Sequence, residues 1–256
     1  MKLILLTKRS LASIAFCALI GAAAAAMAIT STFKAVQTAA EPKEVPVYRV
    51  ESGKKQVAIS FDAAWGNEET PQLLEILDKY EVKATFFLVG EWVDKYPEDV
   101  KEIVAHGNDI GNHSDTHPHM PQLSGEKMSD EIRHCNKKIE ALTGHAPTLF
   151  RAPYGDYDNN LVKTVRGLGM YCVQWDVDSL DWKDPTPDQL TRNVLKKVTD
   201  GSIVLMHNGA KNTPAALPGI IEGIQDKGYE IVLIKDLLPE GEYYTDVQGE
   251  LHLTEN

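Results

Sequence analysis

The chain has 256 residues, of which 43% are hydrophobic and 25% are charged, and its formal net charge is −11. This length is sufficient for one large domain or two small ones. The negative charge argues against nucleic acid as a partner, because the chain has no basic surface to offset phosphates.

The N-terminal part of the chain has the features of an export segment. Basic residues precede an apolar run at residues 11–30, which ends in small residues. This pattern predicts a signal peptide, although the run is also long enough to cross a bilayer as an anchor. We therefore expect residues 1–31 to be a signal peptide or an N-terminal membrane anchor, and residues 32–50 to be a linker. The protein is expected to be exported, and either membrane-anchored or secreted.

Short apolar runs alternate with helical segments over residues 51–240. The expected strands are residues 56–61, 84–89, 109–113, 148–152, 171–177, 202–206 and 229–234. The expected helices are residues 71–80, 97–107, 125–144, 159–169, 188–201 and 216–228, with Thr70 and Ser124 as N-caps of the first and third. About seven β/α units predict a parallel sheet covered by helices, either as a barrel or as an open doubly wound sheet. Residues 241–256 form an acidic tail that is either disordered or a final hairpin.

Reactive side chains follow five of the expected strands. In chain order they are Asp62, His113, His117, Arg151, Asp176, Asp178, Asp181 and His207. All strand ends of a barrel converge on one mouth, whereas in an open sheet only the ends beside the switch point converge. The spread over five strands therefore favours a barrel.

His113 and His117 lie in the segment HSDTHPHM, just after the third expected strand. Two imidazoles four residues apart can face the same way and hold one metal ion, and zinc suits two nitrogens plus an oxygen. The alternative is a pair of surface or capping histidines. His119 is expected to be structural or to lie at the rim of the site.

Asp62 stands where an apolar strand becomes a loop. A carboxylate beside a metal ion is a suitable general base, and the alternative is a turn or cap residue. Arg151 also ends an apolar strand, and a buried guanidinium needs a carboxylate partner, for which Asp62 is a candidate. An ordinary structural ion pair would give the same pattern. The loop at Tyr154 could direct a backbone N–H at a developing oxyanion.

His207 follows four apolar residues, so it is either a core histidine or a proton donor to a leaving amine. In the second case Asp181 or Asp178 would form a hydrogen bond with it and raise its pKa. Leu205 lies on the same strand face and would line the pocket. Trp65 and Trp182 are expected to form walls that contact a sugar.

Several catalytic motifs are absent from the sequence. It contains no H-E-x-x-H, G-x-S-x-G, P-loop or G-x-G-x-x-G pattern. This absence argues against a serine hydrolase and against a nucleotide or dinucleotide cofactor.

Five segments in order, SFDAAWG, HSDTHP, RAPYG, DSLDW and LMH, resemble the motifs of the polysaccharide deacetylase family, the NodB-homology carbohydrate esterases. The chain is most similar to the sporulation-associated members of spore-forming bacteria. The resemblance covers about residues 54–238 and implies a distorted (β/α)7 TIM-like barrel outside the bacterial cytoplasmic membrane. The implied activity is metal-dependent N-deacetylation of amino sugars in a cell-envelope glycan such as peptidoglycan.

The resemblance also implies a role for each matching residue. Asp62 would be the base and Arg151 would orient it, while His113 and His117 would hold the metal, usually zinc. Asp181 would tune His207, the acid, and Leu205 would line the acetyl pocket. Trp65, Tyr154 and Trp182 remain the expected substrate-binding walls.

One position departs from the family pattern, because Ala63 stands where a second aspartate normally binds the metal. The metal could be bound with a substitute ligand, namely Asp62, Asn67 or Glu68. It could instead be bound weakly, or not at all. In the last case the chain would be a glycan-binding or scaffold protein of the envelope. An unrelated metal-dependent amidase on the same barrel is a weaker alternative.

Overall fold

The computed structural model describes residue 22 and residues 42–239 and 243–254. Lys43–Asn256 makes up one compact unit, and the account below concerns that unit. The expected signal peptide or anchor, and most of the expected linker, lie outside the described residues. A search of the described helices finds none that is long and apolar enough to cross a membrane.

A parallel sheet forms the centre of the unit. Its strands are β2 (Gln56–Ala63), β3 (Thr85–Leu88), β4 (Asp109–Asn112), β5 (Leu149–Phe150), β6 (Tyr171–Cys172), β7 (Val177–Asp178), β8 (Ile203–His207) and β9 (Glu230–Val232). The order is β6-β5-β4-β3-β2-β8-β7, and β9 pairs with β2. Only residues 173–176 separate β6 from β7, the two ends of that order. A linker this short keeps the two edges close, so the sheet must curl. The structure thus confirms the distorted (β/α)7 barrel.

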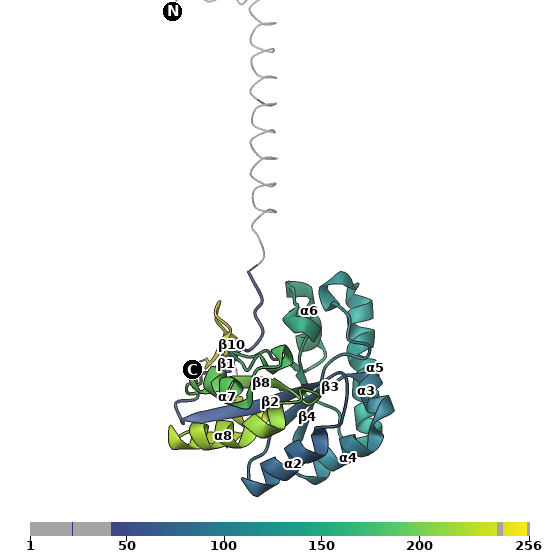
Figure 1. Ribbon diagram of the computed structural model, residues 1–256. Helices are drawn as coiled ribbons and strands as arrows, with labels where there is room; N and C mark the ends of the chain where they lie inside the picture. Colours follow the sequence, from purple (N-terminus) through teal and green to yellow (C-terminus); the bar gives the residue numbers. More distant parts are fainter. Residues whose placement is uncertain (1–21, 23–41, 240–242, 255–256) are drawn as a thin grey trace, which may run out of the picture. The chain divides into compact units, whose positions relative to one another are not determined.

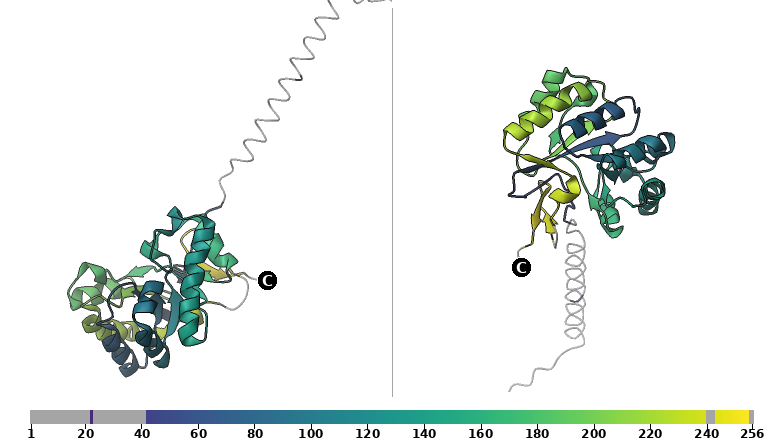
Figure 2. Two further views of the ribbon diagram at one scale, coloured as in Figure 1. Left: turned by 90° about the vertical axis from the view of Figure 1, so that its right-hand side faces the viewer. Right: turned by 90° about the horizontal axis from the view of Figure 1, so that it is seen from below.

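Helices cover the outside of the curled sheet (Figures 1 and 2). They are α2 (Thr70–Lys79), α3 (Gly90–Lys95), α4 (Pro97–Ala105), α5 (Gly125–Thr143), α6 (Asn159–Gly167), α7 (Pro187–Leu195), α8 (Thr213–Asp226) and α9 (Ile234–Leu237). The order of contact among the larger helices is α7, α8, α2, α4, α5 and α6. It follows the order of the strands, as expected for right-handed β/α units.

The central strand β2 separates the apolar layer from the interior of the barrel. Val57, Ile59, Phe61 and Ala63 belong to the apolar cluster that the helices cover. Because alternate side chains of a strand face opposite sides, Asp62 points away from that cluster. The strand therefore directs Asp62 and Ala63 to different environments.

The local sequence signals were right at one helix and wrong at another. Ser124 caps α5, and its side chain accepts a hydrogen bond from the backbone N–H of Lys127. Thr70 is not the cap of α2, because the helix already includes it and Glu69 occupies the N-cap position. The Thr70 hydroxyl instead accepts a hydrogen bond from Asn208 Nδ2 at 3.1 Å. A tertiary partner thus takes the oxygen that a cap would use.

The described part of the acidic tail forms a hairpin. Its strands are β10 (Tyr243–Thr245) and β11 (Glu250–Leu253), and β11 also pairs with β1 (Arg49–Val50) in a three-stranded sheet. The expected fifth strand, residues 171–177, is two short strands, β6 and β7, with an irregular segment between them. Val173 in that irregular segment is 0% exposed. Its apolar character therefore reflects burial in the core and not a continuous strand.

Candidate active site

A pocket of about 470 Å³ lies at the carboxyl ends of the strands. Its walls include every catalytic and wall residue expected from the sequence except Arg151 and Asp181, which lie behind them. The lining residues are Asp62, Ala64, Trp65, His113, His117, Tyr154, Trp175, Asp178, Trp182, Leu205 and His207. Five strands, β2, β4, β5, β7 and β8, and the loops after them thus bring the predicted side chains together.

Arg151 and Asp62 form a buried ion pair behind the pocket. Arg151 Nη1 donates a hydrogen bond to Asp62 Oδ1 at 2.7 Å, as the sequence suggested. Nη2 donates to Ser60 Oγ at 2.9 Å and to the backbone carbonyl of Gln174 at 3.2 Å. The guanidinium carbon also lies 4.0 Å from the centre of the Phe87 ring. These contacts fix the guanidinium, which in turn fixes the orientation of the carboxylate.

The environment of Asp62 keeps its carboxyl group ionised. Burial by itself raises the pKa of this group, and the charge of Arg151 is the largest of the contributions that oppose burial. The charges of His113 and His207 act in the same direction, so the pKa is lowered from its ordinary value. Asp62 Oδ1 is bound by Arg151, and Oδ2 is the oxygen that lies toward His113.

Asp181 and His207 form the second pair. His207 Nδ1 lies 2.7 Å from Asp181 Oδ1, and the backbone N–H of His207 donates to Oδ2 at 2.7 Å. Thr213 Oγ1 donates to the same Oδ2 at 2.9 Å. Because the carboxylate accepts the proton on Nδ1, Nε2 is the nitrogen left for a ligand in the pocket. Of the two aspartates considered from sequence, Asp181 is the one in contact with His207.

The pKa of His207 is raised above its ordinary value. Burial alone favours the neutral imidazole, but the hydrogen bond and charge of Asp181 outweigh burial. Asp62 and Asp178 add further negative charge nearby. The imidazolium form therefore persists to higher pH than that of a free histidine, as a proton donor requires.

The rings of His113 and His117 meet edge-on, with centres 4.9 Å apart and planes at 67°. His113 Nδ1 is 2.8 Å from the carbonyl oxygen of Arg151, so Nδ1 carries the proton and Nε2 faces Asp62 Oδ2 at 3.5 Å. Burial lowers the pKa of both histidines, and that of His117 falls to about 4. Both rings are thus neutral near pH 7, which is the form that binds a metal ion.

These donors fit a divalent ion through two imidazoles, but the usual carboxylate is missing. Ala63 is 0% exposed and packs in the apolar cluster. Two of the expected substitutes make contacts outside the site: Asn67 Nδ2 donates to Asp99 Oδ2 at 2.7 Å, and Glu68 Oε2 accepts from the backbone N–H of Asn67 at 3.0 Å. Neither side chain lines the pocket. Asp62 is the remaining carboxylate beside the two histidines.

Strained backbone is concentrated around the pocket. Ser114, His117, Tyr154 and Leu180 have positive φ angles of 67°, 58°, 60° and 60°, although none is glycine. This conformation costs free energy and persists only where surrounding contacts enforce it. Its occurrence in the loops beside the candidate metal ligands and Asp181 supports a functional role for these loops.

Exposed aromatic rings surround the mouth of the pocket. The side chains of Trp65, Tyr154 and Trp182 are 55%, 61% and 56% exposed. The Trp65 ring stacks on His207, with centres 5.9 Å apart and planes at 21°. The loop that carries Trp65 packs closely on Gly209, just after β8. A Cβ added to Gly209 would lie only 2.6 Å from the Trp65 carbonyl oxygen, which shows how near the two segments are. The backbone at Trp65 is therefore closely packed, while all three rings remain exposed at the mouth.

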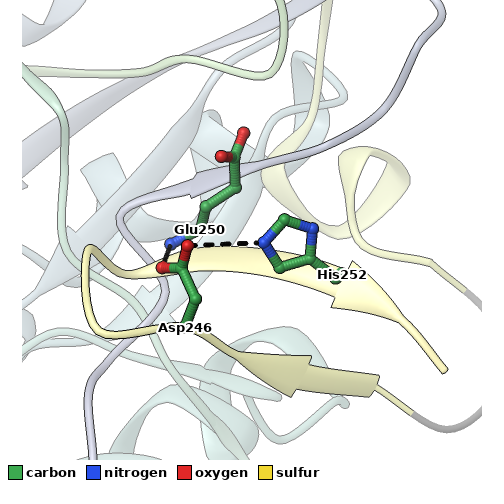
Figure 3. A group of neighbouring side chains, drawn as sticks. All are labelled: Asp246, Glu250 and His252. Carbon is green, nitrogen blue, oxygen red and sulfur yellow. Dashed lines mark hydrogen bonds and ion pairs between the residues drawn. The ribbon is translucent and has the colours of Figure 1, made fainter.

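A second group of possible metal ligands lies far along the chain, on the hairpin. Among the described residues, Asp246, Glu250 and His252 form the group of three whose ligand atoms lie within 4.8 Å of one another (Figure 3). Protein partners already bind them: Glu250 pairs with Arg49 at 3.0 Å, and His252 pairs with Glu51. Asp246 Oδ1 accepts the backbone N–H groups of residues 248 and 250. We assign this group to holding the hairpin on β1.

Several residues of the site were not anticipated from the sequence. Ser60 and Thr213 are fully buried and bind Arg151 and Asp181. A hydroxyl residue is too common to stand out before the fold gives it a charged neighbour. Trp175 lines the pocket, and its place in the acidic, tryptophan-rich segment at residues 175–184 was the available signal.

The chain is similar to several known proteins. Residues 49–173 match the family model described as polysaccharide deacetylase. The chain is 37% identical over 195 residues to the uncharacterized protein YlxY of Bacillus subtilis, covering 76% of this chain and 61% of YlxY. It is 35% identical over 211 residues to the peptidoglycan-N-acetylglucosamine deacetylase PgdA of Listeria monocytogenes, covering 80% of this chain and 45% of PgdA. The chain thus spans less than two thirds of the length of these relatives.

Among solved structures, wild-type BA3943 of Bacillus anthracis is described as a CE4 family pseudoenzyme. It superposes with a TM-score of 0.74 at 40% identity, covering 78% of this chain and 71% of that one. A BA3943 mutant described as having restored enzymatic activity gives a TM-score of 0.74 at 41% identity, covering 78% and 73%.

Proposed function

The chain belongs to the polysaccharide deacetylase family, and we propose that it hydrolyses N-acetyl groups of amino sugars in a cell-envelope glycan such as peptidoglycan. One observation carries the proposal. Two pairs, the buried Arg151–Asp62 and the partly buried Asp181–His207, place an ionised carboxylate and an imidazole of raised pKa on one pocket. A base and an acid are what amide hydrolysis requires. The name of PgdA supports peptidoglycan as the substrate class.

Asp62 acts as the base. Its lowered pKa keeps the carboxylate ionised, and Oδ2 takes a proton from the water that attacks the acetamide carbonyl. Arg151 holds Oδ1 and so directs Oδ2 at the pocket. The backbone N–H of Tyr154, in its strained turn, stabilises the oxyanion that develops on the carbonyl oxygen.

His207 acts as the acid. Asp181 holds Nδ1 and raises the pKa, so that the imidazolium, with its proton on Nε2, persists to higher pH than in a free histidine. Nε2 donates that proton to the sugar nitrogen as the carbon–nitrogen bond breaks. The products are acetate and a free amine on the sugar, and Leu205 lines the pocket that accommodates the acetyl methyl group.

His113 and His117 would hold a divalent ion, for which zinc suits the two neutral imidazoles. When bound, the ion supplies Lewis-acid polarisation of the water and the carbonyl group. Its affinity is lower than in family members with two aspartates, because Ala63 offers no ligand atom.

A second candidate function is glycan binding without turnover, in a scaffold protein of the envelope. The loss of the carboxylate at Ala63 favours it, as does the similarity to BA3943, a structure described as a pseudoenzyme. The same aromatic walls would then bind the glycan. In both cases the basic, apolar N-terminal segment supports export, with the chain anchored in or released from the membrane.

Replacement of the proton donor tests the first function against the second. We expect His207→Ala to reduce acetate release from N-acetylglucosamine oligomers by about 10²–10⁴-fold, with glycan affinity unchanged. His145→Ala, at an exposed histidine, is the control and should alter neither quantity. An equal loss of release and affinity would remove His207 from the acid role.

A further inference from the structure

His119 and Asp156 make contacts that the proposed mechanism does not use. His119 lies two residues after His117, and the pocket does not include it. Its Nδ1 is 3.1 Å from Asp156 Oδ2, and the two side chains are 49% and 43% exposed. Its ring also stacks on Tyr154, with centres 4.3 Å apart and planes at 19°.

These contacts extend the pocket outward as a continuous row of rings. Tyr154 meets His117 edge-on inside the pocket, with centres 4.5 Å apart. Its other close ring neighbour is His119, which lies outside the pocket. The row therefore begins at a candidate metal ligand and ends on the exposed surface, beside the carboxylate of Asp156.

We propose that Tyr154, His119 and Asp156 form a subsite for the sugar unit next to the one whose acetamido group enters the pocket. The inference rests on the proposed function, in that an amino sugar occupies the pocket. Its consequence is that the chain selects oligosaccharides over single sugars.

The chemistry of the three side chains suits a pyranose. The apolar face of a sugar ring packs on aromatic surface, and Tyr154 and His119 present such a surface already ordered by their stacking. The contact between His119 and Asp156 uses one imidazole nitrogen and one carboxylate oxygen. The second oxygen of Asp156 is available to accept hydrogen bonds from sugar hydroxyls, and such charge-assisted bonds are strong.

Titration of the full chain with N-acetylglucosamine and with its tetramer tests the subsite. The wild-type chain should bind the tetramer more tightly than the single sugar. We expect His119→Ala combined with Asp156→Ala to weaken tetramer binding about tenfold and to leave binding of the single sugar unchanged. His119→Phe preserves ring stacking, so it should recover part of the loss.

Tyr244→Ala is a matched control, because Tyr244 is 55% exposed and stacks on His252 of the hairpin. It should leave the affinity for both ligands unchanged. Equal wild-type affinity for the single sugar and the tetramer would overturn the subsite, as would a double variant that still prefers the tetramer. Binding is measured without turnover. A protein that releases no acetate but shows the predicted length dependence would therefore refute the proposed reaction and support the subsite.

Discussion

The two halves of the pocket differ in how completely their charged and polar groups are partnered. On the acid–base side, Asp62 and Asp181 are 5% and 3% exposed, and each has a partner side chain at 2.7 Å, Arg151 and His207. On the metal side, His113 and His117 are neutral and their rings meet edge-on, but the neighbouring position on β2 is Ala63.

The difference separates residues that stabilise the fold from residues that only the proposed reaction requires. A buried carboxylate without its partner destabilises the protein, so these pairs contribute to stability independently of the chemistry proposed for them. A metal ligand can be replaced by a small apolar residue that simply joins the core, as Ala63 does. Loss of one metal ligand is therefore compatible with an intact fold.

The largest expected effect on stability comes from breaking the buried pair. Arg151→Met should lower the free energy of unfolding by about 3–5 kcal/mol, because Asp62 is left buried without its cation. Urea denaturation measures the loss. Arg166→Met, which breaks an exposed pair with Glu44, is the control and should cost less than about 1 kcal/mol. Equal losses in the two variants would show that the buried pair contributes no more to stability than the exposed pair.

The metal side should respond differently to substitution. Ala63→Asp places a carboxylate in the apolar cluster, and we expect it to cost about 1–3 kcal/mol of unfolding free energy in the presence of a chelator. Zinc should restore part of that loss, because an ion that binds the native state stabilises it. Ala64→Asp, at a position that lines the pocket, should cost less. If zinc stabilises Ala63→Asp no more than the wild-type chain, the carboxylate does not reach the ion.

A smaller effect should appear in the titration of His207, the proposed proton donor. Asp181→Asn removes the negative partner that raises the pKa of His207, so that pKa should fall. The imidazolium would then be lost at lower pH, and the alkaline limb of acetate release should move to lower pH. Imidazole chemical shifts followed by NMR measure the change. Asp188→Asn removes the same charge from an exposed position and should leave His207 unaffected.

Much of this arrangement was predictable from the sequence because it depends on periodicity and on charge. The alternation in β2 and the polar residue after each apolar run predicted a barrel with its reactive groups at one end. The contact between Arg151 and Asp62 followed from the cost of an unpaired buried charge.

The remaining features depend on contacts between distant segments. Asn67 was expected as a substitute ligand, but α4 supplies Asp99 as a nearer partner. Ser60 and Thr213 acquire their roles only when the fold brings them to Arg151 and Asp181. No local pattern in the sequence encodes these contacts.

Acetate release from N-acetylglucosamine oligomers and from peptidoglycan, with zinc added or chelated, tests the central claim most directly. We predict release by the wild-type chain that depends on zinc and is abolished by His113→Ala, despite Ala63. No release from either substrate, with glycan still bound, would contradict the claim and identify the chain as a glycan-binding member of the family.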